Sequence, residues 1–198
     1  MGTLIGAVGY RQLRDHSAPF VLLERLEAAH LGPDITVEDV SYNPIALMQW
    51  LQGDAKGTFE HAIFIASVER AGRAPGRVDA YRWDGVLPSE QLIQQAVADA
   101  VTGIISLDNT LVIAGYFQAL PPRVAIVEIE PREHEFGTTL SPDVTAAVEI
   151  ALDLTRTLAT DHAAFEALPP GGLGVRPRYG VQVRDRGPTP ASRKAEVR

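Results

Sequence analysis

This sequence offers imidazoles, carboxylates and hydroxyls for chemistry but no thiol, because its 198 residues include no cysteine. Disulfides, thiolate nucleophiles and cysteine-ligated zinc are therefore excluded, and a protein-bound metal would need His, Asp or Glu as ligands. Asp15 and His16 place a carboxylate beside an imidazole shortly after Gly9. This pair either takes part in chemistry or forms a hydrogen bond within a loop.

Several common catalytic and nucleotide-binding motifs are absent. The sequence has no Gly-x-Ser-x-Gly elbow and no Gly-Lys-Ser/Thr phosphate loop. The run from Gly6 to Gly9 begins like a dinucleotide fingerprint, but Gln12 stands where the third glycine is required. Pro19 also occupies the approach to the following helix. We therefore do not expect serine-hydrolase, P-loop or dinucleotide chemistry.

Alternating strands and helices must position the reactive side chains. Short apolar or alternating runs predict strands, and apolar residues at helical spacing between start and stop signals predict helices. The expected strands cover residues 3–8, 35–40, 61–66, 77–83 and 123–129, and the expected helices cover 20–29, 45–51, 90–101, 111–119 and 142–158. Ser89 and Ser141 are expected to cap two of these helices, and Ser106 or Asp108 a third.

This order of elements predicts an α/β fold, a three-layer α/β/α sandwich with a mainly parallel central sheet. In such a sheet, binding sites collect at the carboxyl ends of the strands. The loops after Val8, Val40 and Ile65 should therefore meet at one edge. The strand at 77–83 alternates between apolar and polar residues, as an edge or half-exposed strand would.

Length and composition fit one globular domain with an appendage. With 45% hydrophobic residues the chain can bury a sizeable core. We expect the domain over residues 1–168 and a flexible tail over 169–198, because the tail is rich in Pro, Gly and Arg. The net charge of −7 is uneven, since residues 170–198 carry seven basic and two acidic side chains. The tail is either a tether for an acidic surface or a solvated extension.

Charge and hydropathy also limit the partners. An acidic body argues against nucleic-acid binding, which depends on basic surface that displaces counterions. No apolar run approaches the roughly 20 residues that span a bilayer, and no signal-type segment opens the sequence. We expect a cytoplasmic protein with no nucleic-acid partner and no membrane insertion.

Several segments, taken in order, resemble the hydrogenase maturation endopeptidases. The resemblance extends over roughly residues 3–160, and it is carried by Gly9, Asp15, the strand at 61–66, Ala74-Pro75-Gly76, Glu130-Pro131, Gly137 and Leu140-Ser141-Pro142-Asp143. It implies the phosphorylase/hydrolase-like sandwich of that family. It also implies a protease that removes the C-terminal extension of a nickel-iron hydrogenase large-subunit precursor, with nickel sensed in the client rather than permanently bound.

The metal-sensing positions of that family are occupied by different residues here. Where the family has Glu, a strand-end Asp and His, this sequence has His16, Ala66 and Asp108. Ala66 cannot coordinate a metal. The resemblance therefore leaves His16 and Asp108 as candidate metal ligands, since imidazole and carboxylate both suit nickel or zinc.

Two functions are compatible with this pattern. In the first, His16 and Asp108 form a rebuilt site and the protein is a divergent protease. In the second, it is a catalytically inactive relative, a pseudoenzyme that serves as a hydrogenase assembly chaperone or binding subunit. Asp15, Tyr42 and Ser67 are the candidate substrate-binding residues in either case, and Asp15 or Ser67 would complete or orient a rebuilt site.

Simpler roles for individual residues remain open. Asp108 can cap a helix, and His134, between Glu133 and Glu135, is expected in a solvated loop. An unrelated small-molecule enzyme is a further alternative, which a deep apolar pocket remote from His16 would favour.

Overall fold

A six-stranded sheet forms the centre of the molecule in a computed structural model that describes residues 2–174. The strand order is β2-β1-β3-β5-β4-β6. Neighbours among β1, β2, β3 and β5 pair in parallel, β4 runs antiparallel to β5, and β6 is parallel to β4. The strands are β1 (Gly2–Val8), β2 (Ile35–Asp39), β3 (Phe59–Ser67), β4 (Val78–Trp83), β5 (Arg123–Ile129) and β6 (Pro170–Gly171).

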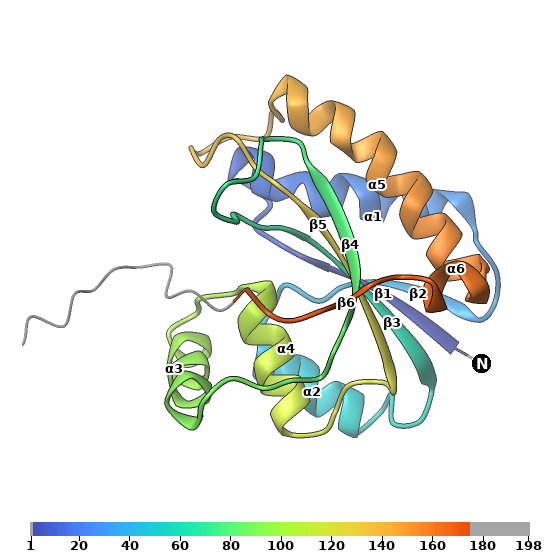
Figure 1. Ribbon diagram of the computed structural model, residues 1–198, viewed down its shortest axis with the longest axis vertical. Helices are drawn as coiled ribbons and strands as arrows, with labels where there is room; N and C mark the ends of the chain where they lie inside the picture. Colours follow the sequence, from blue (N-terminus) through green and yellow to red (C-terminus); the bar gives the residue numbers. More distant parts are fainter. Residues whose placement is uncertain (1, 175–198) are drawn as a thin grey trace, which may run out of the picture.

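Helices cover both faces of this sheet (Figure 1). On one face lie α1 (Ala18–Ala29), α5 (Pro142–Thr160) and α6 (His162–Glu166), and on the other lie α2 (Pro44–Gln52), α3 (Glu90–Val101) and α4 (Leu107–Tyr116). A short 3-10 helix, η1 (Arg14–Ser17), precedes α1. The predicted three-layer α/β/α sandwich with a mainly parallel sheet is confirmed.

The central strands are apolar throughout because they are buried on both faces. Ile63 and Ile65 of β3 pack in the core under α1 and α5, whereas Ala62 and Phe64 pack in the core under α2 and α4. Alternate side chains of a strand point to opposite faces, so a strand between two helical layers needs apolar residues at every position. The run at 61–66 satisfies this requirement.

The edge of the sheet differs from its centre. Every residue of β4 is half-buried, which agrees with the alternating pattern of its sequence. Beyond the expected domain boundary at 168, Pro170 and Gly171 pair with Arg82 and Trp83 of β4, and Leu173 packs against the α2 and α4 core. The start of the expected tail is therefore part of the folded domain. The remainder, residues 175–198, lies outside the described residues.

The helix caps follow from local sequence. Ser106 is the N-cap of α4, where its hydroxyl accepts a hydrogen bond from the Asn109 backbone N–H, so Asp108 lies in the first turn rather than at the cap. Ser141 is the N-cap of α5, with Pro142 in the first turn. Within residues 2–174, we find no helix with the length and apolar character needed to cross a membrane.

Candidate functional site

A cluster of two imidazoles and a carboxylate lies where the strands β1, β3 and β5 end. His16 Nε2 is 2.8 Å from His134 Nδ1, and His134 Nε2 is 3.0 Å from Glu69 Oε1. We call His16, Glu69 and His134 the carboxyl-edge cluster. His16 is half-buried, whereas Glu69 and His134 are exposed. The cluster is therefore connected internally and open to a partner.

The topology of the sheet explains this meeting point. β1 lies between β2 and β3. The chain therefore passes from β1 to β2 on one side of β1 and then crosses to β3 on its other side. Ligands of open α/β sheets bind at such a reversal, outside the carboxyl ends of the strands. His16 follows β1, Glu69 follows β3 and His134 follows β5. Each member thus comes from a loop at the same sheet edge.

A close backbone approach positions His16. The Tyr10 N–H donates a hydrogen bond to the His16 carbonyl oxygen, which closes the loop after β1. A Cβ atom at Gly9 would lie 2.5 Å from that oxygen. Real Cβ atoms do not approach so closely, so only glycine permits this loop to fold back.

The buried carboxylate of Asp15 fixes the loop that carries His134. Its oxygens accept hydrogen bonds from the backbone N–H groups of Arg132, Glu133 and Ser141 and from the Ser141 hydroxyl, at 2.7 to 2.9 Å. Burial raises the pKa of Asp15, but these four hydrogen bonds favour the ionised form and lower its pKa overall. Asp15 has no exposed surface, so its role in this structure is to position His134.

A second polar network surrounds Arg70, immediately after Glu69. Arg70 donates through Nη1 and Nη2 to both oxygens of Asp108, at 2.9 and 2.8 Å, and also binds Glu128 of β5. Arg73 and the Tyr81 hydroxyl complete the contacts of Glu128. Burial raises the pKa of Glu128, whereas the two guanidinium groups lower it by more. We call Arg70, Arg73, Tyr81, Asp108 and Glu128 the Arg70 network.

The structure thus assigns different partners to the two candidate metal ligands. His16 faces His134, and both oxygens of Asp108 are bound by a guanidinium. Among residues 2–174, neither belongs to a group of three side chains spaced to hold one metal ion. A site built jointly from His16 and Asp108 stays a prediction.

The remaining candidates differ in exposure. Ala66 and Ser67 end β3 in buried positions, and the Ser67 hydroxyl finds no hydrogen-bond partner within the part of the chain described. Tyr42, in the loop after β2, is 47% exposed. Tyr42 is thus the candidate substrate-binding residue with surface available for contact with another protein.

Sequence reasoning missed Glu69 and His134. His134 lies exposed in a loop, as predicted, but it also contacts both His16 and Glu69, which the sequence did not indicate. One signal could have found it: His134 follows a central parallel strand at its carboxyl end, as His16 does. The pairing itself required the strand order.

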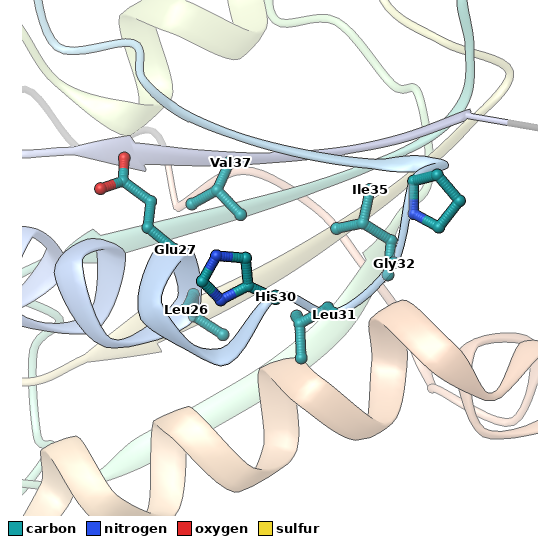
Figure 2. Close-up of a pocket in the computed structure, with 8 residues that line it drawn as sticks. Leu26, Glu27, His30, Leu31, Gly32, Ile35 and Val37 are labelled. Carbon is teal, nitrogen blue, oxygen red and sulfur yellow. The ribbon is translucent and has the colours of Figure 1, made fainter.

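The pocket in Figure 2 lies elsewhere, between the end of α1 and the start of β2. Its volume is about 540 Å³, and it is lined by Leu26, Glu27, His30, Leu31, Gly32, Pro33, Ile35 and Val37. It is remote from His16 along α1, as the small-molecule alternative requires. However, it adjoins the amino end of its strand, opposite the edge where sites of parallel sheets collect, and its charged or titratable side chains are Glu27 and His30 alone.

Comparison with solved structures gives several proteins of the same fold. The hydrogenase 2 maturation peptidase from Thaumarchaeota archaeon SCGC_AB-539-E09 is 23% identical, with a TM-score of 0.56 over 81% of this chain and 100% of that chain. The hydrogenase maturating endopeptidase HybD from E. coli is 20% identical, with a TM-score of 0.57 over 78% of this chain and 90% of that one. The nickel-iron hydrogenase maturation protease HycI from Thermococcus kodakarensis is 13% identical, with a TM-score of 0.59 over 81% and 93%.

The sequence matches no family model and no curated protein. The solved structures nevertheless confirm the resemblance to hydrogenase maturation endopeptidases at the level of the fold. This chain shares that fold over nearly the full length of those structures.

Proposed function

We propose that this protein acts in the maturation of a nickel-iron hydrogenase, as a maturation-protease-like protein that engages the C-terminal extension of the large-subunit precursor. The shared fold supports this process, since the compared structures are named hydrogenase maturation peptidases or proteases. The observation that carries the proposal is the carboxyl-edge cluster, which presents two imidazoles at the reversal of strand order.

The donor atoms of this cluster suit nickel held by the client. Imidazole nitrogen is a good ligand for divalent nickel. If His134 Nε2–H donates to Glu69, then His134 Nδ1 accepts a hydrogen bond from His16 Nε2–H. Two nitrogens that share a metal at about 2.1 Å lie about 3 Å or more apart, close to the observed 2.8 Å. Transfer of the His16 proton from Nε2 to Nδ1, together with a small rotation of either ring, would therefore admit the nickel of the precursor.

The same arrangement has a role in peptide-bond cleavage. Glu69 holds His134 in one orientation, and His134 in turn faces His16. A carboxylate and imidazoles in series can accept a proton from water near a scissile bond, which is general-base catalysis. In this role His16 or His134 would activate the water and Glu69 would act as a positioning residue.

Exposed aromatic side chains beside the cluster support binding of a protein client. Phe136, two residues after His134, is 83% exposed, and Tyr10 and Tyr42 are 38% and 47% exposed. Tyr10 follows β1 and Tyr42 follows β2, so both lie at the carboxyl edge. Exposed aromatics at one edge are typical of surfaces that bind a polypeptide.

The alternative function is client binding without cleavage, and the Arg70 network favours it. The Arg70 guanidinium pairs with both oxygens of Asp108, the carboxylate that a rebuilt metal site would use. Ala66 offers no ligand at the end of β3. A chaperone or assembly subunit needs the aromatic surface and the nickel-facing imidazoles, but no further ligands.

An incubation with nickel-loaded, unprocessed large subunit separates these functions. Intact-mass measurement of the client would show loss of a defined C-terminal peptide if the protein is a protease, and this loss should disappear with His16→Ala and with His134→Ala. Stable binding at unchanged mass would assign the chaperone role. His30→Asn is the matched control, because His30 lies at the far end of α1 and its positive φ of 48° is one that Asn tolerates. Absence of both binding and cleavage would contradict the proposal.

A further inference from the structure

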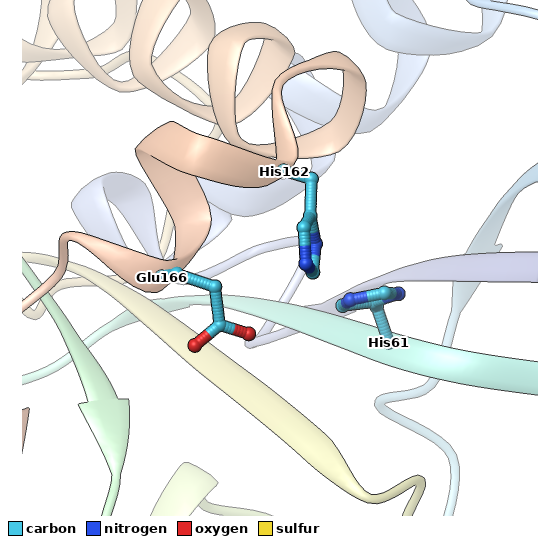
Figure 3. Close-up of side chains that lie close together, drawn as sticks. All are labelled: His61, His162 and Glu166. Carbon is cyan, nitrogen blue, oxygen red and sulfur yellow. The ribbon is translucent and has the colours of Figure 1, made fainter.

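Three side chains with metal-binding atoms converge at the end of the sheet opposite the carboxyl-edge cluster (Figure 3). His61 lies near the start of β3, level with Thr3 and Arg123 at the starts of β1 and β5. His162 and Glu166 lie one turn apart in α6, so they face the same way. One ligand atom from each of the three lies within 4.8 Å of the other two.

Two of these three side chains carry a buried polar atom without a hydrogen bond. His61 Nε2 and Glu166 Oε1 are buried, and each is without a hydrogen-bond partner in the described part of the chain. Arg123 Nε is 3.0 Å from Glu166 Oε1, but outside the geometry of a hydrogen bond. Buried polar atoms in folded proteins are almost always satisfied, by protein groups or else by water or an ion. Both atoms belong to side chains that converge with His162 (Figure 3), so one ligand bound among the three would account for them.

We propose that His61, His162 and Glu166 bind one divalent transition-metal ion of the zinc class. Two imidazole nitrogens and one carboxylate oxygen form a three-ligand donor set suited to zinc, and they leave a fourth position for water or another ligand. Harder cations such as Mg²⁺ and Ca²⁺ prefer oxygen ligands, so this donor set selects against them.

The surroundings hold two of the three ligands in place. Glu166 Oε2 accepts a hydrogen bond of 2.8 Å from Arg82 Nη1, and Oε1 lies 3.0 Å from Arg123 Nε, a contact that the metal would displace. Such contacts beyond the ligands orient metal-binding carboxylates and imidazoles. The His61 ring packs edge-on against Phe165, with 5.0 Å between centroids. His162 is exposed, and it can rotate to close the site.

The required movement is small. Ligand atoms around a tetrahedral zinc, each at about 2.1 Å, lie about 3.4 Å apart. The present separations are at most 4.8 Å, so a shift of about one to two ångströms by His162 would complete the geometry.

Local charge sets the expected strength of binding. Arg82 and Arg123 pair with Glu166, and Arg123 also pairs with Glu60 at 2.8 Å. The two guanidinium groups are thus balanced by two carboxylates before the metal is added. Because the ion then introduces uncompensated positive charge, we expect a soft, imidazole-seeking ion to bind and a simple electrostatic competitor such as Ca²⁺ to fail.

The bound ion would join α6 to the central sheet. α6 has only five residues, and Phe165 is its buried side chain. The two residues of β6 follow shortly after α6. A metal shared by β3 and α6 would therefore fasten the C-terminal part of the domain, and this site is separate from the nickel-facing cluster of the proposed function.

The test is metal titration of the full chain after treatment with a chelator. Calorimetry with Zn²⁺ should give one binding event assigned to this site, and Co²⁺ should give visible absorption bands of a low-coordinate nitrogen and oxygen site. His162→Ala and Glu166→Gln should each weaken this event at least about tenfold. His30→Asn should leave it unchanged.

Two further variants keep the assignment falsifiable. His16→Ala and His134→Ala remove imidazoles from the opposite end of the sheet, so they should not change this event, whatever their effect on the hydrogenase precursor. His162 is exposed, so His162→Ala should keep the fold, and circular dichroism would check it. Absence of Zn²⁺ and Co²⁺ binding in the unmodified protein, or equal binding by His162→Ala and Glu166→Gln, would overturn the site.

Discussion

The Asp15 carboxylate accepts both the backbone N–H and the hydroxyl of Ser141, at 2.7 and 2.8 Å. This pair joins the loop after β1 to the start of α5, and the same carboxylate holds the loop after β5 through Arg132 and Glu133. Two loops that are distant in the sequence are thereby fixed together, and each carries one imidazole of the carboxyl-edge cluster.

Replacing Asp15 with alanine should destabilise the fold. Asp15→Ala leaves four donors without their buried acceptor, so we expect a loss of about 2 to 4 kcal/mol in the free energy of unfolding. Urea denaturation would measure it. Asp161→Ala is the control, because Asp161 caps α6 at an exposed position and should cost about 1 kcal/mol. Equal losses in the two variants would contradict this account of Asp15.

Asp15 should also contribute a pH dependence to stability. Its pKa in the folded protein lies below the unfolded value of about 3.9. Its stabilising contribution is therefore fully present above the unfolded pKa and is lost as the pH falls through the folded pKa. Relative to Asp15→Asn, the unmodified protein should be more stable at neutral pH, and the difference should shrink in acid. Thermal unfolding between neutral pH and pH 3 would test this; a constant difference would contradict it.

Removing the Arg70 guanidinium from the Arg70 network should strongly lower the free energy of unfolding. Arg70 is 12% exposed and Glu128 is fully buried. Arg70→Gln leaves Glu128 with only Arg73 and Tyr81, and the loss of a partner in a buried ion pair costs several kcal/mol. We expect about 2 to 4 kcal/mol by urea denaturation.

Two matched variants define what the Arg70 result means. Arg11→Gln breaks the pair of Arg11 with Asp39, in which Arg11 is 55% exposed, and it should cost less than about 1 kcal/mol. Adding Glu128→Gln to Arg70→Gln should recover part of the loss, since it removes the buried charge. A double variant as unstable as the sum of its singles would show that charge is not the cause.

His16 and His134 should act as one unit in client binding. Their ring nitrogens are 2.8 Å apart, and residues in direct contact give effects that do not add. His16→Ala and His134→Ala should each weaken binding of the nickel-loaded precursor, and the double variant should be little weaker than either single one. Biolayer interferometry with the precursor would measure this. Additive losses would assign the two imidazoles to independent contacts.

The core and the strand order depend on different kinds of information. Apolar runs such as 61–66 and 123–129 predict buried strands locally, because burial on both faces requires apolar side chains at every position. The helices from 90 and from 142 have Ser89 and Ser141 at their N-cap positions, as predicted, although neither side chain makes a capping hydrogen bond. These elements could be predicted because each depends on neighbouring residues.

The sequence by itself determined the α/β class, the near-complete set of elements and the edge of the sheet at which His16 lies. Only the tertiary structure decided which polar side chains meet. Arg70 forms an ion pair with Asp108, His134 contacts His16, and His61 lies close to His162. These contacts form because β3 pairs with both β1 and β5, and the loops and α6 pack around the ends of these strands. The physical reason is that burial selects apolar residues in each strand separately, so a strand can be predicted from its own residues. Contacts between polar groups depend instead on the order and register in which the strands assemble.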